Sequence, residues 1–224
     1  MARVIGLTGP FGSGKSTTAV IKGLQWSTAS GAKIFANFPM RNAFLFDSYQ
    51  DWYRIADLHG SVVIFDESQT NFDSRKWANE ANTTLTQIFN YVRKMNCVFI
   101  FILPSYNNID TRIRQNTELL INCEKTPGGT IINHIYDYQD KAYGEWGKLL
   151  NKWVLPPSSQ KKVYTQDIFD TNSMVKSFPM PEGKKQTIEF FEELARRHDA
   201  ALKRLGIYKE IETLDKGELT IYAS

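Results

Sequence analysis

The chain has 224 residues, of which 42% are hydrophobic and 23% are charged, enough apolar material for one well-packed domain with an appendage rather than two large domains. A formal net charge of +3 is too small to indicate a polyanionic partner by itself. The longest uninterrupted apolar run, Cys97–Leu103, is far shorter than the roughly 20 residues of a membrane-spanning helix, so we expect no transmembrane anchor.

The first residues lead directly into a predicted strand and a glycine-rich turn. They lack the basic start, apolar core and cleavage site of a signal peptide, so we expect a cytoplasmic protein. Val4–Thr8 is a β-prone run, and Lys15–Thr28 places Ala19, Val20 and Leu24 on one side of a helix. The segment therefore predicts a strand, a loop and a helix.

The next 70 residues or so repeat this alternation. We expect strands at Lys33–Asn37, Ser61–Phe65 and Cys97–Leu103, and helices at Asp47–Leu58 and Asn79–Lys94. The last two strands are continuous apolar runs, which is typical of strands buried on both faces of a parallel sheet. The pattern predicts an α/β fold in which helices cover a central, mainly parallel sheet in three layers.

An antiparallel hairpin is predicted at one edge of this sheet. Leu119–Glu124 and Thr130–Tyr136 are β-prone, and they flank the turn Thr126–Gly129. We therefore expect an α/β core over residues 1–145 and a C-terminal extension over residues 146–224.

The extension begins with a linker-like stretch at Trp153–Ser159 and contains one long amphipathic helix at about residues 181–205. Its apolar stripe recurs at steps of three and four residues: Ile188, Phe191, Ala195, His198, Leu202 and Leu205. Packing against the protein's own core is favoured over a seam with a partner helix, and the alternative stays open.

The cysteines and histidines are predicted to be structural. Cys97 and Cys123 lie in predicted buried strands without a CxxC motif, which favours small core residues over a disulfide or a zinc site. His59, His134 and His198 share no spacing that indicates a metal site or a catalytic triad.

The turn after the first strand carries the clearest motif, because it matches G-x-x-x-x-G-K-[ST] between a strand and a helix. Loop amides and the helix N-terminus can surround phosphates there. Lys15 would reach the β- and γ-phosphates of ATP, and the Ser16 hydroxyl would bind Mg²⁺; the alternative is a glycine-rich turn without nucleotide. The predicted ATP-binding residues are Gly9, Pro10, Phe11, Gly12, Ser13, Gly14, Lys15, Ser16 and Thr17.

Two carboxylates follow the central strand Ser61–Phe65. Ligands of open α/β sheets bind at the carboxyl ends of the strands, where Asp66 and Glu67 lie. We expect Asp66 to hold Mg²⁺ and Glu67 to orient and deprotonate the attacking water. The alternative is a pair of capping or loop carboxylates. A small-molecule kinase is a rival hypothesis, but a glutamate directly after the metal-binding aspartate favours attack by water, and no arginine-rich lid is visible.

With these motifs the sequence resembles the additional-strand, catalytic-glutamate P-loop ATPases, which implies a RecA/FtsK-like three-layer fold. The box Asp66–Gln69, followed by Phe72 and Arg75, is similar to the FtsK/HerA superfamily. The element Asn37–Pro39 and the run Asp110–Asn116 resemble its viral branch. That branch includes tectivirus-like genome-packaging ATPases and the related zonula-occludens-toxin-like ATPases of filamentous phages. The resemblance covers residues 1 to about 140.

The resemblance implies a homo-oligomeric ring, often a hexamer, that threads double-stranded DNA and hydrolyses ATP at subunit interfaces. It implies an arginine finger, for which Arg112 and Arg114 are the candidates and Arg93 is the runner-up. For each arginine, a solvated or ion-paired role remains the alternative. Asn107 or Ser105 would sense the γ-phosphate.

The leading hypothesis is therefore a Mg²⁺-dependent motor that packages viral double-stranded DNA into a procapsid. It would work in the host cytoplasm or with the virion, beside a capsid or portal-vertex protein. The rivals are a kinase, a non-catalytic nucleotide-dependent assembly factor, and a filamentous-phage-type assembly ATPase, against which the missing membrane segment counts.

Overall fold

An eight-stranded sheet forms the centre of the molecule, in a computed structural model that describes residues 4–67, 81–106, 111–170, 175, 180–181 and 183–207. The strand order is β3-β2-β4-β5-β1-β6-β7-β8. The strands are β1 (Val4–Thr8), β2 (Lys33–Ala36), β3 (Ala43–Leu45), β4 (Ser61–Phe65), β5 (Cys97–Ile102), β6 (Leu119–Lys125), β7 (Ile131–Asp137) and β8 (Lys148–Leu155). The strands from β3 to β6 in this order run parallel, and β7 and β8 add antiparallel neighbours.

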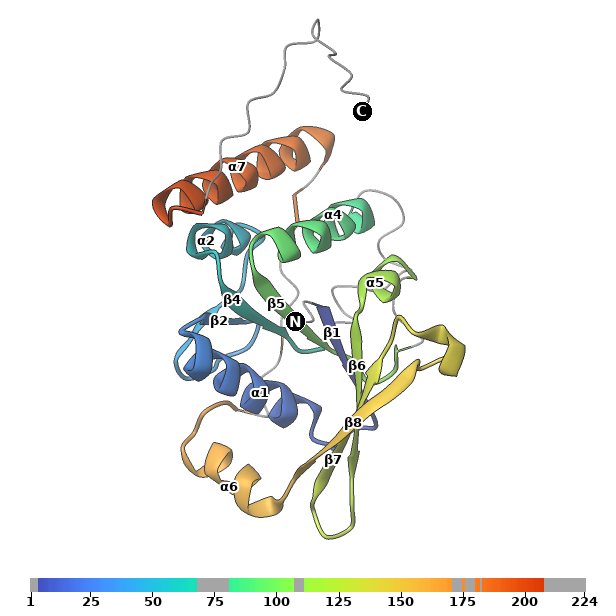
Figure 1. The fold of residues 1–224 in the computed structure, drawn as a ribbon. Helices are drawn as coiled ribbons and strands as arrows, with labels where there is room; N and C mark the ends of the chain where they lie inside the picture. The colour runs from blue at the N-terminus through green and yellow to red at the C-terminus, as the bar shows by residue number, and fades with distance from the viewer. Residues whose placement is uncertain are drawn as a thin grey trace, which may run out of the picture.

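Helices cover both faces of this sheet, which confirms the predicted three-layer α/β architecture (Figure 1). One face carries α1 and α6, and the other carries α2 and α4, with α7 packed outside α2. The helices are α1 (Lys15–Ser30), α2 (Asp51–Leu58), α4 (Ala81–Lys94), α5 (Thr111–Asn116), α6 (Pro157–Thr165) and α7 (Gly183–Arg204), with a 3₁₀ turn η2 (Lys141–Tyr143). No helix of the described ranges is long and apolar enough to cross a bilayer.

The three central strands bring the two predicted motifs to one edge of the sheet. Strand β5 lies between β1 and β4 and is parallel to both, with Val4 beside Phe99 and Ser61 beside Cys97. It is the additional strand that the sequence resemblance implies. Every residue of β1, β4 and β5 is buried, because helices cover both faces. This arrangement is a P-loop NTPase fold.

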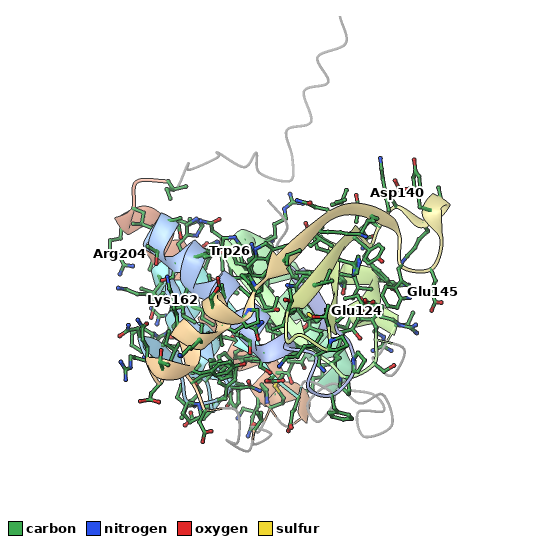
Figure 2. All side chains as sticks on the ribbon, turned by 90° about the horizontal axis from the view of Figure 1, so that it is seen from below. Trp26, Glu124, Asp140, Glu145, Lys162 and Arg204 are labelled. Carbon is green, nitrogen blue, oxygen red and sulfur yellow. The ribbon has the colours of Figure 1, made fainter. Side chains whose placement is uncertain are left out.

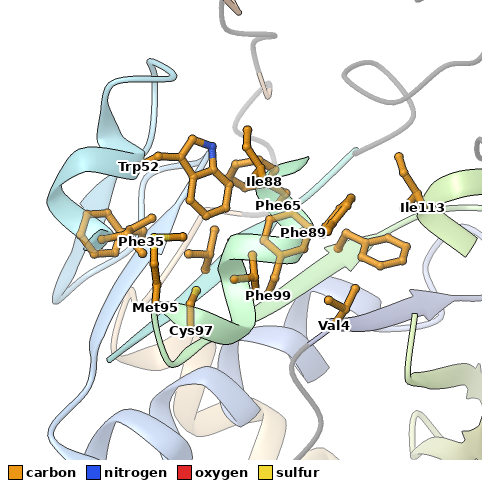
Figure 3. Close-up of a cluster of buried hydrophobic side chains, with 14 of the residues drawn as sticks. Val4, Phe35, Trp52, Phe65, Ile88, Phe89, Met95, Cys97, Phe99 and Ile113 are labelled. Carbon is orange, nitrogen blue, oxygen red and sulfur yellow. The ribbon is translucent and has the colours of Figure 1, made fainter. Parts of the chain in front are cut away.

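An aromatic cluster holds the carboxyl end of β4 in place (Figure 3). The Phe65 ring meets Phe46 at 4.8 Å and Phe99 at 5.0 Å between centroids, and Phe89 of α4 meets Phe99 at 5.2 Å. Such edge-to-face pairs contribute about 0.5–1.5 kcal/mol each beyond the burial of their surface. Phe65, the residue before Asp66, is therefore anchored by rings from the segment after β3 and from β5.

The predicted hairpin is confirmed, but the sheet continues beyond it. Strands β6 and β7 pair antiparallel, and β8 then pairs with β7, so the sheet passes residue 145, where the extension was expected to begin. The linker-like stretch at Trp153–Ser159 is the end of β8 and the start of α6. Strand β8 gave no clear strand pattern because it is an edge strand whose side chains are mostly exposed.

Helix α7 packs against the protein's own core, as favoured, through a stripe that differs from the expected one. Its buried residues are Phe190, Leu194, His198 and Ala201. Ile188 and Leu205, which were expected in the stripe, are exposed. The buried stripe is set by the contact with α2 and the residues before it, because Phe190 meets the rings of Tyr49 and Tyr53, both at 5.5 Å between centroids. The Arg197–Asp57 ion pair at 2.8 Å closes the same contact.

Candidate functional site

The predicted phosphate-binding loop joins the buried end of β1 to the start of α1, and its backbone requires glycine. Gly9, Gly12 and Gly14 have φ values of 145°, 74° and 90°, a region that disfavours side chains. A Cβ at Gly9 would lie 2.3 Å from the Cys123 carbonyl oxygen, and one at Gly14 would lie 2.2 Å from Ile131 Cδ1. The hairpin that holds Cys123 and Ile131 therefore fixes how closely the loop packs.

Two polar side chains of this loop, Lys15 and Ser13, are placed to bind an anion. The Lys15 ammonium donates to the carbonyl oxygens of Gly9 and Pro10, at 2.8 Å each, so it lies over the loop itself. Burial lowers the pKa of Lys15, and nearby Cys123 and Asp66 act in the opposite direction. The Ser13 hydroxyl is buried and has no hydrogen-bond partner within the described residues. Phosphate oxygens would satisfy both groups.

Asp66 stands at the end of β4, next to the start of α1. Its Oδ2 accepts a short hydrogen bond from the Ser16 hydroxyl. Its backbone is held by Asn37 in both directions: the Asp66 amide donates to Asn37 Oδ1 at 2.8 Å, and Asn37 Nδ2 donates to the Asp66 carbonyl at 3.0 Å. The loop and the carboxylate, 50 residues apart in sequence, thus form one unit.

The Ser16 and Asp66 oxygens fit a magnesium ion. Burial raises the pKa of Asp66, while hydrogen bonds from Ser16 and the Glu67 amide and the charge of Lys15 lower it. A half-buried carboxylate beside a hydroxyl is a hard oxygen donor set that a dication would stabilise in its charged form. Mg²⁺ is commonly held by one or two such groups together with phosphate oxygens.

Glu67 turns the chain away from the sheet directly after Asp66. It has a φ of 46°, and its amide donates to Asp66 Oδ1 at 2.7 Å. Its side chain is exposed and lines the same cleft as Lys15, Ser16 and Asp66. A left-handed conformation is uncommon at residues with a side chain, and in the described residues it also occurs at Asn42, His59, Asn96 and Asp167. The position suits a base that faces incoming water.

These groups line part of a cleft of about 390 Å³, within the range of ligand pockets. The lining also includes residues that sequence reasoning did not place there: Phe38, Lys125, Tyr164, Phe169, Asp170 and Val175. They come from three separate stretches of the chain. Only the paths of β2, β6 and the segment after β8 bring them together, so no local motif signals them.

The segment after β8 reaches this cleft by crossing beside α1. Figure 2, seen from below, shows α6 with Lys162 lying against α1, which carries Trp26. The Tyr164 hydroxyl is 2.6 Å from the Thr17 hydroxyl. Residues 163–170 thus wrap over the core, although their sequence did not indicate whether they contact the core or a neighbouring subunit.

The other predicted site residues lie away from the cleft or outside the described residues. Arg112 and Arg114 are on α5, which leads into β6 where Leu119 pairs with Ile5, so they lie towards the opposite edge of the parallel strands. Arg93 is exposed at the end of α4. Ser105 lines a neighbouring hollow of about 290 Å³, together with Gly9 and Pro10 of the loop and with Pro104, which also lines the cleft. Asn107 lies outside the described residues.

Comparison with known proteins confirms the resemblance for part of the chain. Residues 40–143 match the family described as Zonular occludens toxin (Zot). Curated proteins give no match.

Solved structures provide further similarities. The chain is similar to the N-terminal domain of zonular occludens toxin from Neisseria meningitidis, at 17% identity and a TM-score of 0.48, over 76% of this chain and 100% of that one. It is similar to the genome packaging NTPase B204 from Sulfolobus turreted icosahedral virus 2 in complex with ATP-gammaS, at 13% identity and a TM-score of 0.46, over 69% and 97%. The complex of B204 with AMPPCP gives 12% identity and a TM-score of 0.47, over 69% and 98%.

Proposed function

We propose that the chain is a Mg²⁺-dependent ATPase whose hydrolysis of ATP moves double-stranded DNA, most simply in viral genome packaging. The observation that carries the proposal is the convergence of Lys15, Ser16, Asp66 and Glu67 at one end of a single cleft. A phosphate-binding loop alone would suit many nucleotide-binding proteins. The exposed carboxylate of Glu67 next to the half-buried carboxylate of Asp66 favours transfer of the phosphoryl group to water.

In this proposal the protein groups divide the chemistry among themselves. Lys15 and the loop amides bind the β- and γ-phosphates. Ser16 and Asp66 hold Mg²⁺, which neutralises charge on the phosphates when bound. Glu67 accepts a proton from water as the water oxygen bonds to the γ-phosphorus. The bond from that phosphorus to the β–γ bridging oxygen breaks, and the products are ADP and phosphate.

The oligomeric part of the proposal concerns the arginines. Arg112 and Arg114 lie towards the edge of the sheet opposite the cleft, so they would act only on the cleft of a neighbouring subunit. A role as arginine fingers therefore requires a ring, which the resemblance implies, with a hexamer as our working number. Asn107 or Ser105 as γ-phosphate sensor, a capsid or portal partner and a cytoplasmic or virion location remain parts of the same proposal.

A second candidate is an assembly ATPase of the zonula-occludens-toxin-like kind, which the profile match over residues 40–143 favours. The two candidates share ATP hydrolysis and differ in what it drives. DNA dependence separates them, because a packaging motor acts on long double-stranded DNA.

The experiment is steady-state ATP hydrolysis without DNA, with long double-stranded DNA and with long single-stranded DNA. The packaging proposal predicts that double-stranded DNA stimulates turnover more than single-stranded DNA does. The stimulation should fall as salt rises, because phosphate contacts release counterions. Turnover that ignores both DNAs would favour the assembly role, and transfer of phosphate to a hydroxyl acceptor would favour a kinase.

A further inference from the structure

We propose that residues 163–170 form the nucleobase-binding wall of the cleft, in which Tyr164 and Phe169 pack against the purine of ATP. The inference rests on the proposed function and adds a recognition element supplied by the chain beyond the α/β core. It assigns a binding role to a segment that the catalytic motifs leave unused.

The lining of the cleft combines two kinds of group. An ammonium, a hydroxyl and two carboxylates lie at the glycine-rich loop and the end of β4, and the rings of Phe38, Phe169 and Tyr164 meet one another in the same lining. A nucleoside triphosphate has the same two-part character, because a polyanion is joined through a sugar to a flat aromatic base. With the phosphates on the glycine-rich loop, the base has an aromatic surface available at the other end of the same cleft.

The wall is attached to the core at several points. Gln160 donates to the Gly129 and Leu155 carbonyl oxygens, at 2.8 and 2.9 Å. Val163 is buried against the α1 face of the sheet. The Arg41 amide donates to the Ile168 carbonyl oxygen at 2.7 Å. These contacts hold the segment in place before any ligand binds, which reduces the entropy cost of binding.

The two aromatic residues have complementary positions. Phe169 is buried and forms an isolated bridge with Met40, and its ring meets Phe38 at 6.0 Å and Tyr164 at 6.3 Å. Tyr164 is 42% exposed, and its hydroxyl meets Thr17 at 2.6 Å. Thr17 directly follows Ser16, so the Tyr164 ring stands beside the part of the loop that lies next to the phosphates.

A competing base-binding surface lies on the loop itself. Phe11 also lines the cleft and is 88% exposed, with the Lys15 ammonium 5.7 Å from its ring centroid. We favour the 163–170 wall because it supplies two rings and an acceptor, the Asp170 carboxylate, for an amino or hydroxyl group. Phe11 offers a single, mostly exposed ring.

The test compares binding of ATP with binding of inorganic triphosphate, which has the same charged chain and no base. Calorimetry would be run on the full chain and on Tyr164→Leu and Phe169→Leu. A stacked base contributes about 1–3 kcal/mol, so each change should weaken ATP binding roughly 5- to 150-fold. Triphosphate binding should change much less. Tyr164→Phe, which keeps the ring, should lose less ATP affinity than Tyr164→Leu.

Tyr143→Leu is the matched control, because Tyr143 is an exposed tyrosine on η2 that does not line the cleft. Thermal unfolding of each variant shows whether it folds. Should Phe169→Leu fail to fold, the exposed Tyr164 still carries the test.

Several outcomes would overturn the inference while leaving the proposed function intact. One is a native chain that binds triphosphate as tightly as ATP. Others are equal losses of both ligands in the leucine variants, or a selective loss of ATP in Phe11→Leu instead. A native chain that binds neither ligand would contradict the proposed function itself.

Discussion

The two ends of the cleft are built in different ways. The phosphate end comes from six residues of the loop Gly9–Thr17 and from two residues that follow one buried strand. The aromatic end brings Phe38 together with Tyr164 and Phe169, which lie more than 120 residues further along the chain. A charged ligand requires strict local backbone geometry, whereas an apolar wall requires only rings brought together by the fold. The first leaves a motif in the sequence, and the second does not.

The largest effect should come from crowding the phosphate end. Gly14→Ala places a methyl group against Ile131 at a φ of 90°, so it combines left-handed strain of about 1–2 kcal/mol with overpacking of about 1–3 kcal/mol. We expect a loss of about 2–5 kcal/mol in the free energy of unfolding, measured by denaturant titration. Gly31→Ala is the control, because its φ is 74° but nothing lies within 4 Å of the new Cβ. Equal losses in both variants would refute the close packing of loop and hairpin.

Removing the Lys15 ammonium should weaken binding of the phosphates and leave recognition of the base unaffected. Lys15→Ala deletes charge-assisted contacts worth about 1.5–3 kcal/mol, so ATP binding should weaken roughly 10- to 150-fold. Calorimetry should show a similar loss for triphosphate, because the lysine acts on phosphates alone. Lys22→Ala, about two turns along α1 from Lys15 and stacked 3.9 Å over Trp153, should leave both affinities nearly unchanged. A loss confined to ATP would contradict the division of the cleft.

A buried hydrogen bond ties α1 to the hairpin below the phosphate end. Thr18 donates to Asn133 Oδ1 at 3.0 Å, and both side chains are fully buried. Thr18→Val leaves the Asn133 acceptor without this donor, so we expect a loss of about 1–3 kcal/mol in unfolding free energy. Thr187→Val, which removes an exposed hydrogen bond to the Gly183 carbonyl oxygen at the start of α7, should change stability by less than about 0.5 kcal/mol. An unchanged free energy of unfolding in Thr18→Val would show that this hydrogen bond does not stabilise the packing of α1 on the hairpin.

The smallest effect concerns a region that belongs to neither end. The His198 ring on α7 lies 5.3 Å from the His59 ring. Burial, followed by the charges of His59 and Lys94, lowers the pKa of His198 below its ordinary value of 6.5, and the charge of Asp199 acts in the opposite direction. The unfolded chain therefore binds a proton more readily as pH falls through 6.5. Stability should be full above that pH and decline below it, and His198→Gln should flatten the decline. An unchanged slope in this variant would exclude His198 as its source.

Sequence reasoning reached the parts of the fold in which local pattern and final environment agree. The apolar runs of β4 and β5 became central strands, and the turn at Thr126–Gly129 became a hairpin. Strand β8 was missed because its exposed leucines follow no two-residue pattern. The buried stripe of α7 was predicted at the wrong residues because Phe190 packs against Tyr53 of α2.

The site follows the same rule. The loop and its carboxylates were located by spacing alone, whereas Asn37, which holds the Asp66 backbone, could not be assigned that task until β2 was seen beside β4. The aromatic wall depends on the crossing of residues 156–170 beside α1, which no motif encodes. The roles of Arg112, Arg114 and Asn107 stay predictions.

The most direct test of the central claim compares ATP binding and hydrolysis in the native chain and in Glu67→Gln, with Glu189→Gln on exposed α7 as the control. Loss of a general base typically costs 10²- to 10⁴-fold in rate. The account predicts a fall of about that size in turnover with ATP affinity retained, and no change in the control. Unchanged turnover in Glu67→Gln, with ATP still bound, would contradict it.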